Sequence, residues 1–277
     1  MIRPPVVAGS FYPLNKEMLL KQIEKCFSHP LGPQKIEEDP NIVAAVAPHA
    51  GYIYSGPVAA WTYSKIKKAN YIILGPNHTG LGPVFAVYPK GKWATPLGKV
   101  EVDEEFAKML VDANPLLEFD VVAHDHEHSI EVQLPFLQYR FGNDFKFVPI
   151  AVLNYAPTQD FLKKCESVAT TIASMVKESS KWIVIASSDF THYEPYDYAM
   201  MADNYYIKAI EALDATEFFA RLEEKNASVC GFGPIAIAMI VAKKLGASKG
   251  VLLKYATSGD ITGDTSNVVG YASIIFK

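Results

Sequence analysis

Histidine and aspartate residues follow three apolar segments of the sequence at the point where each segment ends. The pairs are residues 42–47 with His49, residues 71–74 with His78, and residues 182–186 with Asp189 and His192. Imidazole and carboxylate groups bind metal ions and transfer protons. In open α/β sheets, ligand sites form just outside the carboxyl ends of the strands. The three segment ends together predict one shared pocket.

Ordinary loop chemistry is the alternative for each of these residues taken singly. The run Gly75-Pro76-Asn77-His78 contains residues that favour turns for their own backbone reasons. A lone histidine in a loop is usually solvated and idle. The repetition at three segment ends, rather than any one histidine, therefore favours a site.

A second polar cluster lies between His124 and Glu131. On a strand, His124, His126 and His128 would share a face. On a helix, His128 and Glu131 would share one instead, and the apolar residues that follow have helical spacing. We therefore expect His128, and at most Glu131 with it, to point into the pocket. The preferred interpretation of His124 and His126 is a solvated charged loop.

Cys230 precedes a glycine-rich turn and the start of a predicted helix. The positive end of a helix dipole favours a thiolate, which is both a nucleophile and a soft metal ligand. Cys26 and Cys165 lie within helical patterns and are expected to be small buried hydrophobic residues. A core role is the alternative for Cys230 as well, although its glycine-rich setting is unusual for one.

Strands and helices alternate along the chain, and they must position these residues. The predicted strands are residues 42–47, 71–74, 84–88, 145–153, 182–186, 251–255 and 268–276. Most are apolar at nearly every position, which is typical of strands covered on both faces. The predicted helices are one capped by Asn15, residues 57–67, one capped by Asp103, and residues 158–177, 198–213 and 234–245. This order predicts an α/β fold, a central mixed sheet with helices on both faces.

Composition and charge are those of an ordinary globular protein, with 49% hydrophobic residues and a net charge of −4 over 277 residues. We expect one domain over residues 1–277, because the Pro- and Gly-rich stretch at 28–39 has too little chain before it to be a linker. Without a basic face, a nucleic-acid partner is not expected. The apolar segment 233–242 is too short to span a bilayer, and no signal peptide is evident. Three scattered cysteines do not form a disulfide framework, which favours a cytoplasmic location.

Six ordered segments of the chain resemble the Memo family, whose microbial members are also called AmmeMemoRadiSam system protein B. The segments are residues 6–13 (VVAGSFYP), 47–52 (APHAGY), 75–78 (GPNH), 127–131 (EHSIE), 188–192 (SDFTH) and 229–231 (VCG). The resemblance covers almost the whole chain. It implies a fold like that of the class III extradiol dioxygenases, the LigB-like group.

The resemblance also implies roles for individual residues. It places His49, His78 and Cys230 at the family's metal-site positions. Asp189 and His192 match neighbouring pocket residues, with His192 where the dioxygenases keep a catalytic base. A further pocket histidine of the family corresponds to His128. The candidates for catalysis are therefore Asp189, His192 and His128.

One departure from the dioxygenases concerns the third metal-site position. Those enzymes hold iron with two histidines and a carboxylate, whereas this chain offers Cys230. A soft sulfur ligand shifts the preference towards copper(I), zinc or thiolate-bound iron. The substitution therefore weakens the case for ring cleavage, and fold alone does not restore it.

The leading hypothesis is a copper- or iron-binding protein with oxidoreductase activity at a His/His/Cys pocket. His192 would accept or donate a proton, and Asp189 would orient a histidine. One alternative is a binding module without catalysis, for an acidic or phosphorylated peptide. Another is a hydrolase or transferase with Cys230 as nucleophile and His192 or His128 as base. The expected ligand is a small molecule or peptide, and the family's other name points to AMMECR-like and radical-enzyme partners.

Overall fold

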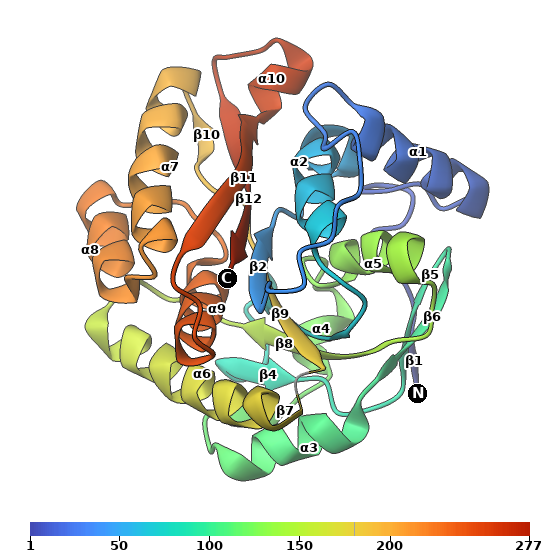
Figure 1. Cartoon of the computed structure of the whole chain (residues 1–277), viewed down its shortest axis with the longest axis vertical. Helices are drawn as coiled ribbons and strands as arrows, with labels where there is room; N and C mark the ends of the chain where they lie inside the picture. Colours follow the sequence, from blue (N-terminus) through green and yellow to red (C-terminus); the bar gives the residue numbers. More distant parts are fainter. Residues whose placement is uncertain (180) are drawn as a thin grey trace.

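A mixed β-sheet runs through the middle of the molecule, and helices cover both of its faces (Figure 1). The computed structural model describes residues 1–179 and 181–277. In order across the sheet, the strands are β1 (Ile2–Arg3), β5 (Lys92–Thr95), β6 (Gly98–Val102), β8 (Lys146–Val152), β3 (Asn70–Pro76), β9 (Trp182–Ser187), β2 (Ala44–Ala47), β12 (Val268–Phe276) and β10 (His192–Glu194). Off this path, β11 (Gly250–Thr257) pairs with β12, and β4 (Phe85–Val87) pairs with β8 and with β7 (Leu117–Phe119).

Four parallel strands, β8, β3, β9 and β2, form the centre of the sheet. All residues of β2 and β9 are buried, because helices cover both faces of these strands. Antiparallel pairs flank the centre, including β12 with β2 and β5 with β6. The predicted mixed sheet is therefore confirmed, and the carboxyl ends of the central strands meet at one edge.

Helices on the two faces pack against two separate hydrophobic clusters. On one face lie α3 (Glu104–Ala113), α6 (Gln159–Ser179), α7 (Tyr196–Glu211), α8 (Ala215–Lys225) and α9 (Phe232–Lys244). On the other lie α1 (Lys16–Ser28), α2 (Tyr52–Lys65) and α5 (Leu134–Phe141). Alternate residues of one strand enter opposite clusters, as Ile72 and Ile73 of β3 do. Three shorter elements are α4 (Val122–Asp125), η1 (Glu131–Gln133) and α10 (Ser258–Thr262).

Each of the seven predicted strands is present, and the predicted helix caps are confirmed. Asn15 and Asp103 accept hydrogen bonds from backbone amides in the first turns of α1 and α3. The helix expected from Pro57 begins earlier, at Tyr52, so Pro57 lies inside it. Helix α8, which Asp214 caps, was not predicted. Among the helices of the described part of the chain, none is both long and apolar enough to cross a membrane.

A buried ion pair fastens the N-terminal segment to the rest of the fold. The Arg3 guanidinium contacts the Glu131 carboxylate at 2.6 Å and lies 4.0 Å from the centre of the Trp93 ring. The carboxylate also accepts a hydrogen bond of 2.6 Å from the Tyr12 hydroxyl. Since both charged side chains are almost fully buried, each depends on the other for its stability.

Candidate metal centre

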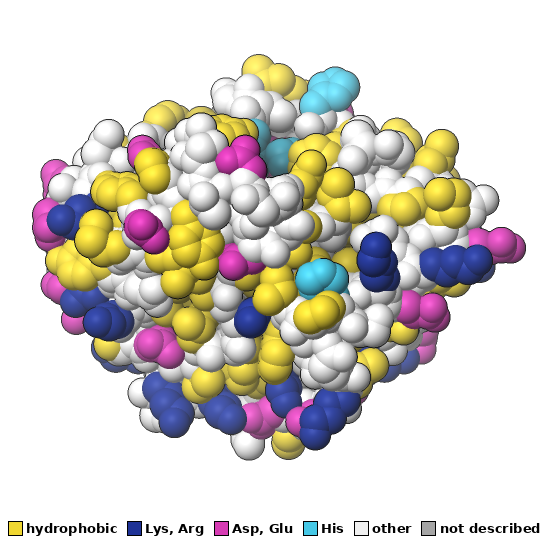
Figure 2. Space-filling view, turned by 90° about the horizontal axis from the view of Figure 1, so that it is seen from above, with side chains coloured by type: hydrophobic (Ala, Val, Ile, Leu, Met, Phe, Trp, Pro, Cys, Tyr) yellow, Lys and Arg dark blue, Asp and Glu magenta, His cyan; other side chains and the backbone are white. Residues whose placement is uncertain are grey.

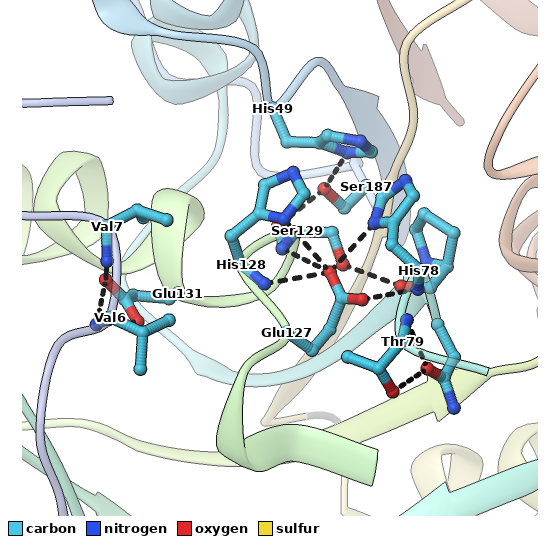
Figure 3. Close-up of polar contacts among 12 residues, drawn as sticks. Val6, Val7, His49, His78, Thr79, Glu127, His128, Ser129, Glu131 and Ser187 are labelled. Carbon is cyan, nitrogen blue, oxygen red and sulfur yellow. Dashed lines mark hydrogen bonds and ion pairs between the residues drawn. The ribbon is translucent and has the colours of Figure 1, made fainter. Parts of the chain in front are cut away.

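Three histidine side chains converge beyond the carboxyl ends of the central strands (Figure 3). His49 follows β2, His78 follows β3, and His128 comes from the loop before η1. Each offers one nitrogen, and these three atoms lie within 4.8 Å of one another. The rings of His78 and His128 stack with centroids 4.7 Å apart, and the His49 ring meets both edge-on. The arrangement brings together three ligand atoms that suit a metal ion.

The site combines a buried and an exposed side. The His49 side chain is 3% exposed and the His78 side chain 37%. In the space-filling view from above, histidine side chains are visible in a recess bordered by hydrophobic, acidic and other side chains (Figure 2). The cluster is therefore open to solvent on the His78 side, while His49 is shielded from water.

His49 is held on three sides by neighbouring groups. Its backbone amide donates to a carboxylate oxygen of Asp189 at 2.8 Å, and its Nδ1 lies 2.8 Å from Oγ of Ser187. Its Nε2 lies 3.3 Å from Sγ of Cys230. Burial, and then the neighbouring histidines, lower the pKa of His49 well below its usual value. The ring is therefore neutral, the form in which imidazole binds metals.

Glu127 organises the other two histidines, a role that was not predicted from the sequence. Its carboxylate accepts hydrogen bonds from Nδ1 of His78 at 3.0 Å and from the backbone amides of His78, His128 and Ser129. Burial alone would raise the pKa of Glu127, but its hydrogen bond to His78 and the nearby imidazoles lower it to about 2. A carboxylate that supports a ligand histidine is common in metal sites. The position of Glu127 directly before His128 is the sequence feature from which this role could have been predicted.

The His78 ring is oriented by this contact. Burial lowers its pKa, but the hydrogen bond to Glu127 and the carboxylate's charge outweigh that effect and raise it. When neutral, the ring donates its Nδ1–H to the carboxylate, because ionised Glu127 only accepts. The lone pair of His78 is then on Nε2.

Cys230 lies beside His49, but it is not one of the group of three histidines that lie within 4.8 Å. The backbone amide of Asp189 donates to its sulfur at 3.2 Å. Burial, and then the charge of Asp189, raise the pKa of the thiol. The expectation that the helix terminus makes Cys230 a thiolate is therefore wrong for the metal-free site. Cys26 and Cys165 are buried, as expected.

The two remaining candidates, Asp189 and His192, border the cluster. Asp189 is buried, which raises its pKa to about 6 against the hydrogen bond from the His49 amide. His192, on β10, lies close enough to affect the pKa values of Asp189 and His49. Its Nδ1 lies 2.8 Å from the carbonyl oxygen of Ser228, which accepts only, so Nδ1 carries the hydrogen.

The segment from His124 to Glu131 differs in part from its prediction. His126 is exposed, as expected, but His124 is fully buried, with Nε2 3.0 Å from the carbonyl oxygen of Ala86. Helix α4 turns this side chain inward against Trp93. Glu131 does not point into the pocket, because Arg3 and the N-terminal segment occupy its carboxylate.

Comparisons with known proteins identify the family and the fold of the chain. Residues 3–275 match a protein family described as Memo-like protein. A MEMO1 family protein of Methanopyrus kandleri is 48% identical over 286 residues, which cover 100% of this chain and 99% of the relative. One from Methanococcoides burtonii is 49% identical over 278 residues, covering 100% of both chains. The fold resembles the crystal structure of an uncharacterized protein from Escherichia coli K12, with a TM-score of 0.56 and 13% identity over 85% of this chain and 100% of that one.

Proposed function

Because this chain belongs to the Memo-like protein family and its histidines converge, we propose that it binds copper or iron through His49, His78 and Cys230. The observation that carries the proposal is the placement of donor atoms around His49. Its ligand nitrogen lies within 4.8 Å of those of His78 and His128, and its Nε2 is 3.3 Å from the Cys230 sulfur. Two imidazoles and a sulfur suit a transition metal better than they suit calcium or magnesium.

His128 is the competing third ligand. Its nitrogen belongs to the group that lies within 4.8 Å, whereas the Cys230 sulfur does not. The two ligand sets differ in softness: a sulfur favours copper(I), and three imidazoles suit copper(II), iron or zinc. In the proposed assignment, His128 borders the bound ion and is available to a ligand in the pocket.

Oxidoreductase activity is the finer part of the proposal. A bound copper or iron ion would supply one-electron chemistry. His192 would accept or donate a proton at Nε2, because its Nδ1–H is committed to the Ser228 carbonyl. Asp189 would hold the His49 backbone in place through the amide hydrogen bond of 2.8 Å.

A second candidate is a transferase or hydrolase that uses Cys230 as its nucleophile. A histidine nitrogen 3.3 Å from a thiol is the arrangement in which the ring takes the thiol proton. Here that histidine is His49, whereas the sequence analysis favoured His192 or His128. Metal-independent labelling of Cys230 by an alkylating substrate analogue would support this candidate over the metal site.

Metal affinity of the purified protein tests the proposal. Metal-free protein is titrated with copper(I), iron(II) and zinc(II) against a chromophoric chelator. His49→Ala and His78→Ala are expected to weaken binding by more than about 100-fold, beyond the usual effect of a supporting residue. Cys230→Ser should weaken the binding of copper(I) more than that of iron(II) or zinc(II), because the Cys230 sulfur is the one soft ligand of the proposed set.

His126→Ala is the matched control, because it removes an exposed imidazole outside the cluster. Equal affinities for His49→Ala and His126→Ala would overturn the proposal. If His128→Ala weakens binding and Cys230→Ser does not, the site is the three-imidazole version.

A further inference from the structure

Ser187 ends strand β9, and its hydroxyl contacts Nδ1 of His49 at 2.8 Å. We infer that Ser187, held by Gln133, is a positioning residue that fixes His49 as the tautomer with a bare Nε2. The tautomer follows from the hydrogen-bond geometry, whereas its value for metal binding rests on the proposed function. Neither Ser187 nor Gln133 is among the proposed ligands.

The amide of Gln133 has one orientation that satisfies its surroundings. Its side chain is fully buried, and its Nε2 lies 3.1 Å from the carbonyl oxygen of Pro48. A carbonyl only accepts, so the atom facing it must be the NH₂ group. The opposite atom, Oε1, accepts a hydrogen bond from the Tyr63 hydroxyl. Gln133 therefore presents a donor to Ser187, at 2.7 Å.

The Ser187 hydroxyl has one hydrogen and can accept two hydrogen bonds. Gln133 donates one of them, and the hydroxyl hydrogen is directed to the carbonyl oxygen of Ser129 at 2.7 Å. The remaining contact, with Nδ1 of His49, must then be one in which the ring donates. If the Ser187 hydroxyl hydrogen pointed toward His49 instead, the buried Ser129 carbonyl oxygen would lose its donor. It would then face the lone pairs of the Ser187 oxygen at 2.7 Å, which is unfavourable.

The consequence falls on the other nitrogen of the His49 ring. With the hydrogen on Nδ1, Nε2 carries a lone pair directed toward the cluster side of the ring, where Cys230 Sγ lies at 3.3 Å. The sulfur can donate to Nε2 or accept from it, so the contacts at Nδ1 decide the tautomer. The Asp189 oxygen is 3.9 Å from Nε2, too far for a hydrogen bond.

The same arrangement recurs at two other histidines in or beside the pocket, His78 and His192. Nδ1 of His78 faces the Glu127 carboxylate at 3.0 Å, and Nδ1 of His192 faces the Ser228 carbonyl at 2.8 Å. In each case an acceptor from the protein holds the hydrogen on Nδ1. Three different partners thus place the hydrogen on Nδ1 and the lone pair on Nε2 in three histidines, which supports the positioning role of Ser187.

Nitrogen NMR on the metal-free protein tests the tautomer directly. The probe is protein labelled with ¹⁵N-histidine, in which protonated and bare ring nitrogens resonate in separate regions. Wild type should show a protonated Nδ1 and a bare Nε2 for His49. Ser187→Ala should shift the ring toward the other tautomer or a mixture, and Ser187→Thr, which keeps the hydroxyl, should restore the wild-type signals.

Ser129→Ala is the matched control, because it removes a buried hydroxyl that bonds to Pro76 and leaves the Ser129 carbonyl in place. It should leave the His49 signals unchanged. Zinc titration of the same samples should give about a 10- to 100-fold weaker affinity for Ser187→Ala, the usual effect of losing a supporting partner.

A protonated Nε2 on His49 in the wild type, or unchanged signals in Ser187→Ala, would overturn the inference whether or not the protein binds zinc. The predicted tautomers in a wild-type protein that binds neither copper(I) nor iron(II) would leave the inference standing and contradict the proposed function instead. The wild-type spectrum decides the question even if Ser187→Ala fails to fold.

Discussion

The carboxylate of Glu127 accepts two hydrogen bonds from one residue, His78: one from its backbone amide at 2.5 Å and one from its ring Nδ1 at 3.0 Å. The pair fixes both the position and the rotation of the ring. Because Glu127 also accepts from the amides of His128 and Ser129, one buried side chain connects the loop that carries His128 to the turn that carries His78. This relationship links the stability of the two loops to the geometry of the site.

Glu127→Gln should weaken metal binding by about 10- to 100-fold, as loss of a supporting carboxylate typically does. The glutamine must place an NH₂ group against one or more N–H donors, and it lacks the negative charge that orients His78. The measurement is the competition titration with zinc. Glu118→Gln, at an exposed carboxylate, is the control. An affinity equal to that of the control would show that Glu127 has no part in the site.

Arg3→Met should lower the free energy of unfolding by about 3–5 kcal/mol, because it leaves the Glu131 carboxylate buried without its partner. Urea denaturation followed by circular dichroism measures the change. Lys35→Met removes a lysine whose side chain is 72% exposed in its ion pair with Glu37 and should change stability by less than about 0.5 kcal/mol. Similar values for both variants would contradict the role of the Arg3–Glu131 pair.

Asp203 gives a prediction about pH. Its buried carboxylate accepts hydrogen bonds from Thr191 and from the Tyr255 hydroxyl, and burial raises its pKa to about 6 from a usual value of 3.8. A raised pKa means that the folded state binds the proton more tightly than the unfolded state. The resulting contribution to stability is fully present below about pH 4 and is lost as the pH rises through about 6.

Asp203→Asn should therefore gain stability relative to wild type across this window, by about 3 kcal/mol for a shift of this size. Urea denaturation of both proteins at several pH values from about 4 to about 7, which spans the two pKa values of the carboxyl group, measures the difference. Asp125→Asn, at an exposed position, should track wild type throughout. A constant difference between Asp203→Asn and wild type would rule out a titrating Asp203.

The fold was largely predictable because its central strands are buried on both faces. Segments such as 71–74 and 182–186 are continuously apolar, and a polar residue directly after each one marks the strand end. The parallel arrangement then brings His49, His78 and Asp189 to one edge of the sheet without any further information. That part of the site follows from local sequence pattern and sheet geometry.

The rest of the site depends on contacts between distant residues, which periodicity does not report. Glu131 has the right spacing from His128 to share a helical face, but Arg3, far away in the sequence, pairs with it. A helix dipole at Cys230 is a local effect of the backbone, whereas burial and the Asp189 carboxylate dominate the pKa of the thiol. Glu127 is a charged residue of a type that is usually solvated. It contacts His78 and His128 only because the fold brings their two loops together.

The most direct test of the account is an anomalous-difference map from crystals of the protein loaded with copper or iron, collected at the absorption edge of the metal. The account predicts one strong peak about 2.0–2.3 Å from Nε2 of His49, Nε2 of His78 and Sγ of Cys230, the usual range for metal–nitrogen and metal–sulfur bonds. A peak bonded to His128 in place of Cys230 would contradict the proposed ligand set. A map with no peak among these residues, at full metal loading, would contradict the metal site itself.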